Sequence, residues 1–249
     1  MAKNFADTVK RLIEYLFPLK HTCNACGREI FSDKYFCEEC ESQITYNDKI
    51  ICNHCGRRTF NSEEYCFSCS GRETYFEKAR SVYIYVSPIS GLIGRLKYNN
   101  KKYLAKIFAK EMYLLYLQNF FNCDIVTFTP MTEERKSERG YNQAEVLAEE
   151  FCKFIELPIC RDVLVKTKET PRQVTVSSAK ERRENLKGSF KLQNKNLIKD
   201  KKVLLIDDVM TTGATVEILC SLLKKGGAKS VFVLTVASVS KGEEGKVGL

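Results

Sequence analysis

Two adjacent carboxylates, Asp207 and Asp208, follow a run of four apolar residues at 203–206. That run is typical of a buried parallel strand, and a helical pattern of apolar residues begins at Val216. A strand, a small-residue turn and a helix can bind a phosphate, because the free amides and the dipole at the helix N-terminus face the anion. The turn has no Gly-x-x-x-x-Gly-Lys-Ser/Thr pattern, so a nucleoside-triphosphate loop is disfavoured. The candidate binding residues of this turn are Val209, Met210, Thr211, Thr212, Gly213, Ala214 and Thr215.

The carboxylates restrict the ligand further. Beside a phosphate they would repel it unless they bind hydroxyl groups, whereas the phosphate itself is held by the amides. A sugar phosphate meets both needs, so this stretch predicts a sugar-phosphate site with Asp207 and Asp208 on the sugar hydroxyls. The alternative is a surface turn with two solvated aspartates.

A second chemical signal comes from the cysteines, eight of which form four Cys-x-x-Cys pairs. The pairs make two repeated units, each with ten residues between its second and third cysteine. Four thiolates suit tetrahedral Zn²⁺ and leave no open coordination position, so the sites are expected to be structural. Equal internal gaps favour sequential units; cross-braced pairing and an iron–sulfur cluster are the alternatives. The expected ligands are Cys23, Cys26, Cys37 and Cys40 in one site, and Cys52, Cys55, Cys66 and Cys69 in the other.

Charge and length set the protein class. The 249 residues carry a formal charge of +9, which is compatible with phosphate-bearing ligands or nucleic acid. No apolar run reaches the roughly 20 residues of a transmembrane helix, and the N-terminus lacks the apolar block of a signal peptide. We therefore expect a cytoplasmic protein without membrane insertion, in which paired cysteines indicate metal rather than disulfides.

Four segments are expected from composition: an N-terminal helix at 1–20, a double zinc ribbon at 21–72, an α/β domain at 79–240 and a tail at 241–249. Within the α/β domain, strands alternate with helices, which implies a mostly parallel sheet covered on both faces. Ligands of such sheets bind beyond the carboxyl ends of the strands. The expected strands are 81–86, 124–129, 163–165, 203–206 and 230–237, and the expected helices are 88–97, 102–120, 141–155 and one beginning near 216.

The cysteine units also contain basic and aromatic residues, a combination that suits single-stranded nucleic acid through phosphate contacts and base stacking. The alternative is that the aromatic side chains pack around zinc and the arginines are solvated. The residues concerned are Arg28, Arg57, Arg58, Phe31, Tyr35, Phe36, Phe60 and Tyr65.

The stretch 203–215 resembles the phosphoribosyl-diphosphate (PRPP) binding motif of type I phosphoribosyltransferases. Further blocks resemble the ComF family of bacterial competence proteins over nearly the whole chain, and Arg139-Gly140-Tyr141-Asn142-Gln143-Ala144-Glu145 is the most specific of them. The segment 127–132 takes the place of the pyrophosphate loop, with Thr132 where the family often has histidine. Other matching blocks are Leu16-Phe17-Pro18, Leu96-Lys97-Tyr98 and Thr170-Pro171-x-Gln173.

This resemblance implies a parallel-sheet type I phosphoribosyltransferase-like domain with an N-terminal double zinc ribbon. It implies PRPP binding, with Asp207 and Asp208 as catalytic residues on the ribose hydroxyls, and Mg²⁺ bound together with PRPP. It also implies a role in natural transformation, with single-stranded DNA and a helicase-like competence protein as partners. A PRPP-sensing adaptor or a nucleobase-salvage transferase is the alternative. The candidates for the diphosphate are Lys97, Arg135, Arg139 and Arg172.

Overall fold

The computed structural model describes residues 21–32, 34–59, 64–71, 73–119, 122–168, 186 and 188–239. The N-terminal helix expected at 1–20, the tail at 241–249 and Arg172 lie outside the described residues.

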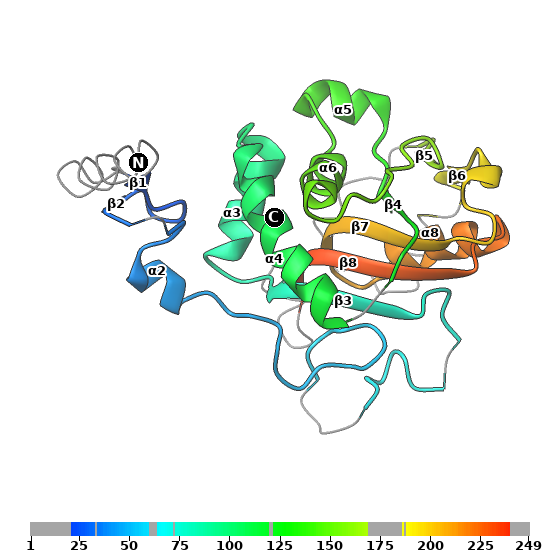
Figure 1. Cartoon of the computed structure of the whole chain (residues 1–249), viewed down its shortest axis with the longest axis horizontal. Coiled ribbons are helices and arrows are strands. Elements are labelled where there is room, and N and C mark those ends of the chain that lie inside the picture. Colours follow the sequence, from blue (N-terminus) through cyan, green and yellow to red (C-terminus); the bar gives the residue numbers. More distant parts are fainter. Residues whose placement is uncertain are drawn as a thin grey trace, which may run out of the picture.

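The centre of the fold is a four-stranded sheet in the order β3-β8-β7-β4, in which every neighbouring pair is parallel. Its middle strands β7 (Lys202–Met210) and β8 (Ser230–Ser238) are continuous apolar runs because both of their faces are buried. The flanking strands are β3 (Lys78–Ile84) and β4 (Ile125–Phe128). The parallel sheet predicted from the alternation of strands and helices is confirmed (Figure 1).

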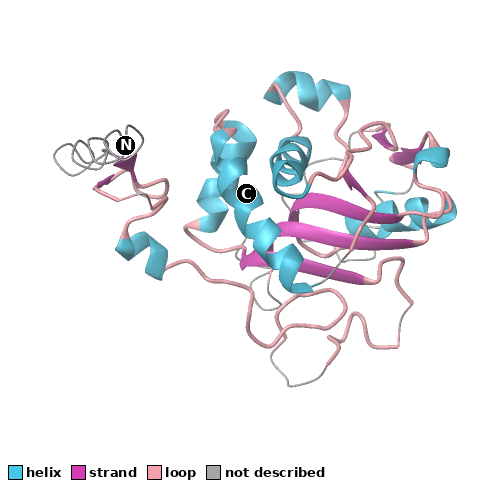
Figure 2. Ribbon diagram, viewed as in Figure 1, coloured by secondary structure: helices cyan, strands magenta, loops and turns pink. Residues whose placement is uncertain are grey.

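Helices cover both faces of this sheet. On one face α3 (Ile89–Tyr98), α4 (Tyr103–Asn119) and α6 (Gln143–Ile155) share a core with Leu204 and Ile206. On the other face α8 (Ala214–Lys225) packs against Val203 and Leu205. The helical spacing of the apolar residues of α6 and α8 explains this placement, since each helix buries one stripe. Figure 2 shows the helices on either side of the central strands.

Two expectations about strands were wrong. The strand expected at 163–165 is β5 (Leu164–Lys166), which pairs antiparallel with β6 (Phe190–Leu192) and does not join the main sheet. Residues 158–160 lie beside β4 instead. The amide of Val126 donates to Pro158 O, and the amide of Cys160 donates to Val126 O. The strand expected to end at Ile206 continues to Met210, because β8 is long enough to pair with it as far as Ser238.

Shorter elements complete the description: β1 (His21–Thr22), β2 (Glu29–Ile30) and α2 (Glu38–Ser42) in the cysteine-rich region, then α5 (Glu133–Arg139) and the 3-10 helix η1 (Lys195–Leu197). Among the described residues, no helix combines the length and the apolar character that crossing a bilayer requires.

Candidate functional site

The acidic pair lies inside strand β7. Phe128 at the end of β4 pairs with Ile206, so Asp207 and Asp208 lie just past the end of β4 while β7 still pairs with β8. Their exposed fractions are 7% and 5%, which excludes the alternative of two solvated aspartates on a surface turn. Buried carboxylates need partners, and these partners define the site.

Asp208 is paired with Lys97, which comes from the last turn of α3. By strand alternation Asp208 shares a face with Leu204 and Ile206, the face that α3 and α6 cover. Burial alone raises the pKa of Asp208, but the Lys97 ammonium, followed by hydrogen bonds from Asp207 and Gln143, outweighs burial and holds that pKa below its usual value. The structure therefore brings Lys97 to the acidic pair and makes the carboxylate of Asp208 an anion.

The pKa of Asp207 is shifted in the opposite direction from that of Asp208. Burial and then the adjacent charge of Asp208 raise the pKa of Asp207 well above its usual value. Its Oδ1 accepts a hydrogen bond from the backbone amide of Asp208 at 2.8 Å. One carboxylate is thus stabilised as an anion while its neighbour is destabilised as one, which is a common sign of a functional site.

Asp207→Asn is expected to stabilise the unliganded protein at neutral pH by about 0.5–2 kcal/mol. Asparagine keeps an Oδ1 acceptor for the amide of Asp208 and removes the repulsion. Because the folded-state pKa is raised, the wild-type protein loses stability as pH rises from the ordinary aspartate pKa toward the raised one. The advantage of the variant should grow over that window, as measured by thermal melts from pH 4 to 8. A variant less stable than wild type at pH 7 would contradict this reading.

The loop after β7 supplies the anion-binding half of the site. Gly213 precedes α8 with a φ of 80°, a left-handed conformation that side chains rarely adopt. The Ala214 amide bonds to Thr212 Oγ1 at 3.4 Å. The amide of Glu217 already donates to Gly213 O at 2.9 Å. The amides of Thr215 and Val216 fall at positions that an α-helix leaves without an intrahelical acceptor, so they can face an anion.

The block from Arg139 to Gln143 holds the acidic site together. Gly140 ends α5 in a left-handed conformation, the Tyr141 hydroxyl donates to the carbonyl of Leu96 beside Lys97, and Asn142 caps α6. The amide nitrogen of Asn142 also donates to Thr129 O at 2.9 Å, which ties the end of β4 to α6. Gln143 and Asn142 were not among our predicted binding residues, although the motif that contains them was the signal that could have found them.

The basic residues expected on the diphosphate are placed differently from one another. Arg139 Nη1 donates to Gln143 Oε1 at 3.1 Å, and its guanidinium lies 4.7 Å from the centre of the Tyr98 ring. Arg135 lies in the first turn of α5, and its amide donates to Thr132 Oγ1 at 3.4 Å. Thr132 is therefore the N-cap of α5, a structural use for the residue found where the family often has histidine.

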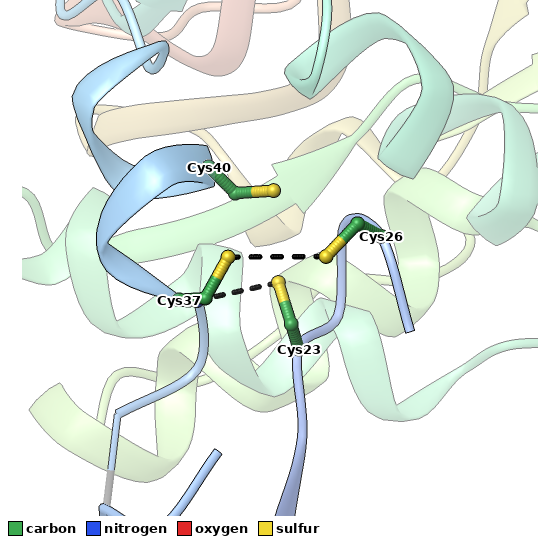
Figure 3. Close-up of side chains that lie close together, drawn as sticks. All are labelled: Cys23, Cys26, Cys37 and Cys40. Carbon is green, nitrogen blue, oxygen red and sulfur yellow. Dashed lines mark hydrogen bonds between the residues drawn. The ribbon is translucent and has the colours of Figure 1, made fainter. Parts of the chain in front are cut away.

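The eight paired cysteines gather into two groups, each with all four Sγ atoms within 4.8 Å of one another. Figure 3 shows the first of them, in which Cys23, Cys26, Cys37 and Cys40 lie close together. The groups are sequential, one from each repeated unit. The Sγ atoms of Cys26 and Cys37 are 3.8 Å apart, and those of Cys55 and Cys66 are 3.7 Å apart. A zinc–sulfur bond of ~2.3 Å in a regular tetrahedron separates the sulfurs by about 3.8 Å, so both groups fit Zn²⁺.

Each cysteine group is attached to the α/β domain. Near the first group, Arg95 Nη2 of α3 donates to the carbonyls of Asn24 and Ala25. Near the second, the amide of Ala79 in β3 donates to His54 O at 2.8 Å. A Cβ on Gly56 would lie 2.4 Å from Ala79 O, so glycine is required for this contact.

Burial limits the nucleic-acid interpretation of the two cysteine units. The side chain of Arg57 is only 8% exposed, and Arg28 forms an ion pair with Glu39 at 2.8 Å. Phe36 is buried, whereas Phe31, Tyr35 and Tyr65 are exposed. Phe60 lies outside the described residues.

Comparison with known proteins agrees with this architecture. Residues 138–247 match the family model of the phosphoribosyl transferase domain, and residues 12–70 match that of the double zinc ribbon domain. The fold is therefore a phosphoribosyltransferase-like α/β domain with an N-terminal double zinc ribbon, as predicted, and the two four-cysteine groups are structural Zn²⁺ sites.

Whole-chain relatives show the same combination. Competence protein F of Haemophilus influenzae is 30% identical over 86% of this chain and 89% of its own length. The DNA utilization protein YhgH of Escherichia coli K12 is 28% identical over 85% of this chain and 87% of its own. Competence protein ComFC of Streptococcus pneumoniae is 33% identical over 61% of this chain and 64% of its own. This chain therefore belongs to the competence protein F family.

Proposed function

We propose that this protein binds PRPP at the loop between β7 and α8 and catalyses phosphoribosyl transfer. The observation that carries the proposal is the buried pair Asp207 and Asp208 in β7, held by Lys97 and followed, after residues 209–213, by the N-terminus of α8. Carboxylates on a strand that leads through a short loop into a helix suit a ligand that offers both hydroxyls and a phosphate. A ribose 5-phosphate unit is such a ligand.

In this proposal the ribose hydroxyls donate to Asp207 and Asp208, and the 5′-phosphate accepts from the amides of 211–215. Lys97 already keeps the carboxylate of Asp208 ionised in the empty site. It can therefore accept a hydrogen bond from a ribose hydroxyl without first losing a proton. Asp207 is destabilised as an anion in the empty site, so hydroxyl donors there relieve a cost and add to affinity.

Transfer chemistry requires the leaving diphosphate to be neutralised and the ribose to be held still. Mg²⁺ bound with PRPP would supply part of that neutralisation, and carboxylate oxygens are ligands that it accepts. We propose Arg135, Arg139 and Arg172 as the cations of this chain that face the diphosphate. Lys97, the fourth candidate, forms an ion pair with Asp208, and we propose that it holds the acidic pair beside the diphosphate.

The cellular role that we propose follows from the relatives, whose names refer to competence and DNA utilization. We propose that the protein acts in the cytoplasm on incoming single-stranded DNA, together with a helicase-like competence protein. We further propose that residues 21–72 and 79–240 are its two functional units. The net charge of +9 favours a polyanionic partner.

Binding is tested by calorimetry and thermal shift with PRPP and Mg²⁺. Wild type is expected to bind and to melt at a higher temperature with ligand, whereas Asp207→Asn should show no ligand-dependent shift. The variant is expected to be the more stable protein, so a missing shift cannot be assigned to misfolding. Asp162→Asn, a change at an exposed aspartate, is the matched control and should behave as wild type. An unchanged shift in Asp207→Asn would remove the ribose assignment.

Catalysis is tested separately by pyrophosphate release from PRPP across a panel of nucleobases and nucleic-acid ends. We expect release with at least one acceptor and none from Asp207→Asn. Binding of PRPP without release in any mixture would leave the site assignment intact and make the transferase assignment wrong.

A further inference from the structure

The second cysteine group contacts the proposed phosphate loop through one buried arginine. Arg57 follows Cys55 by two residues in the sequence. Its Nη1 donates a hydrogen bond to the carbonyl oxygen of Thr211 at 3.4 Å. Its guanidinium also interacts electrostatically with the thiols of Cys55, Cys66 and Cys69. One charged side chain therefore lies between the zinc site and the first residue of the loop after β7.

Arg57 is buried to an extent that arginine rarely is, with 8% exposed, and Arg80 on β3 is equally buried at 7%. Arg80 interacts with Cys52 and Cys55, and its Nη1 donates to Asn53 O at 3.1 Å. A four-thiolate zinc centre is a net anion, because four thiolates outweigh one divalent cation. The two arginines therefore have a buried counter-charge beside them, which explains how both are tolerated in the core.

Hydrogen bonds and a close backbone contact attach the second cysteine unit to β3 of the sheet. Asn47 Nδ2 donates to Gly56 O at 2.6 Å, and the amide of Asn47 donates to Val82 O of β3 at 2.9 Å. Gly56, which precedes Arg57, lies against Ala79 without room for a side chain. The backbone that carries Arg57 is thus fixed to the sheet, and its guanidinium is directed to Thr211. In Figure 1 the segment after α2 runs along β3 accordingly.

We propose that Arg57 is a positioning residue, held by the second zinc site and by β3, which fixes the loop at Thr211 in the conformation that binds the phosphate. This inference rests on the proposed function for its ligand, but the loop contact itself does not. The first zinc site is attached to a different element, since Arg95 of α3 donates to the carbonyl oxygens of Asn24 and Ala25. The second zinc site would then have a role in ligand affinity as well as in stability.

The test uses the zinc-loaded full chain with Arg57→Gln and Arg57→Lys, and Arg58→Gln as the matched control. Arg58 is the adjacent arginine, is more exposed, and takes part in the unit through its backbone bridge to Ile51. Arg57→Gln should speed hydrogen exchange of the amides at 211–215 in the absence of ligand, and weaken PRPP binding about tenfold, the size of one lost charge-assisted hydrogen bond. Arg58→Gln should change neither quantity.

The conservative variant separates positioning from charge balance. Arg57→Lys keeps the cation beside the thiolates but lacks the reach and the fork of guanidinium, so it should retain about two zinc ions per chain and still show faster exchange at 211–215. Exchange at 211–215 equal to wild type in both Arg57 variants would overturn the proposal. If wild type does not bind PRPP, the proposed function fails, and the exchange measurement alone decides the role of Arg57.

Discussion

Lys97→Met is expected to lower the free energy of unfolding by about 3–5 kcal/mol, the cost of leaving one member of a buried ion pair alone. Asp208 is only 5% exposed, and its carboxylate forms an ion pair with the Lys97 ammonium. Methionine fills most of the lysine volume, so the loss comes from the uncompensated anion and not from a cavity. The change in the free energy of unfolding is measured by urea denaturation at pH 7.

The loss of stability in Lys97→Met should depend on pH and on the presence of the Asp208 carboxylate. The pKa of Asp208 is held below its usual value, so the pair stabilises the fold above the ordinary aspartate pKa, and this contribution is lost as pH falls through the lowered pKa. Lys97→Met combined with Asp208→Asn should recover much of the stability, because no buried charge remains unpaired. Lys101→Met, at an exposed lysine just after α3, is the control. A loss for Lys97→Met no larger than for Lys101→Met would show that the pair contributes little.

Features that depend on spacing along the chain were predictable. The apolar run at 203–206 and the helical pattern after Val216 give strand, turn and helix without reference to the rest of the protein, and the structure has β7, the loop and α8 in that order. The equal gaps between the cysteines likewise predict two sequential groups, and the Sγ atoms gather in that way. In both cases the deciding contacts lie within a few residues or within one repeat.

Features that depend on which segments meet were not predictable in the same way. β7 is longer than its apolar run because its neighbour β8 extends to Ser238, and β5 is displaced from the sheet by residues 158–160. The burial of Arg57 could not be predicted from its residue type, since an arginine beside aromatic residues usually indicates an exposed basic surface. Lys97 was expected on the diphosphate, which stays a prediction, and its ion pair with Asp208 depends on the packing of α3 on the sheet.

Removal of zinc is expected to have the largest effect of all. The segment from 21 to 71 is poor in aliphatic residues, so metal binding supplies its folding free energy, for which about 10–16 kcal/mol per site is typical of structural zinc at pH 7. Elemental analysis of the purified protein should give about two zinc ions per chain. Chelation should then abolish the hydrogen-exchange protection of residues 21–59 and lower the melting temperature of the whole chain, because both cysteine groups share the cores of the α/β domain.

The sequential arrangement makes the two sites separable. Cys26→Ser should leave about one zinc ion per chain, in the second site, and Cys55→Ser about one, in the first. Cys55→Ser should be the more destabilising change, because Cys55 is 4% exposed and packs in one core with Ala79 and Val231, whereas Cys26 is exposed. Cys152→Ser, at a partly buried cysteine outside both groups, should retain both ions. Loss of both ions from either single variant would contradict independent sites, since a thiolate missing from one four-sulfur group removes no ligand from the other.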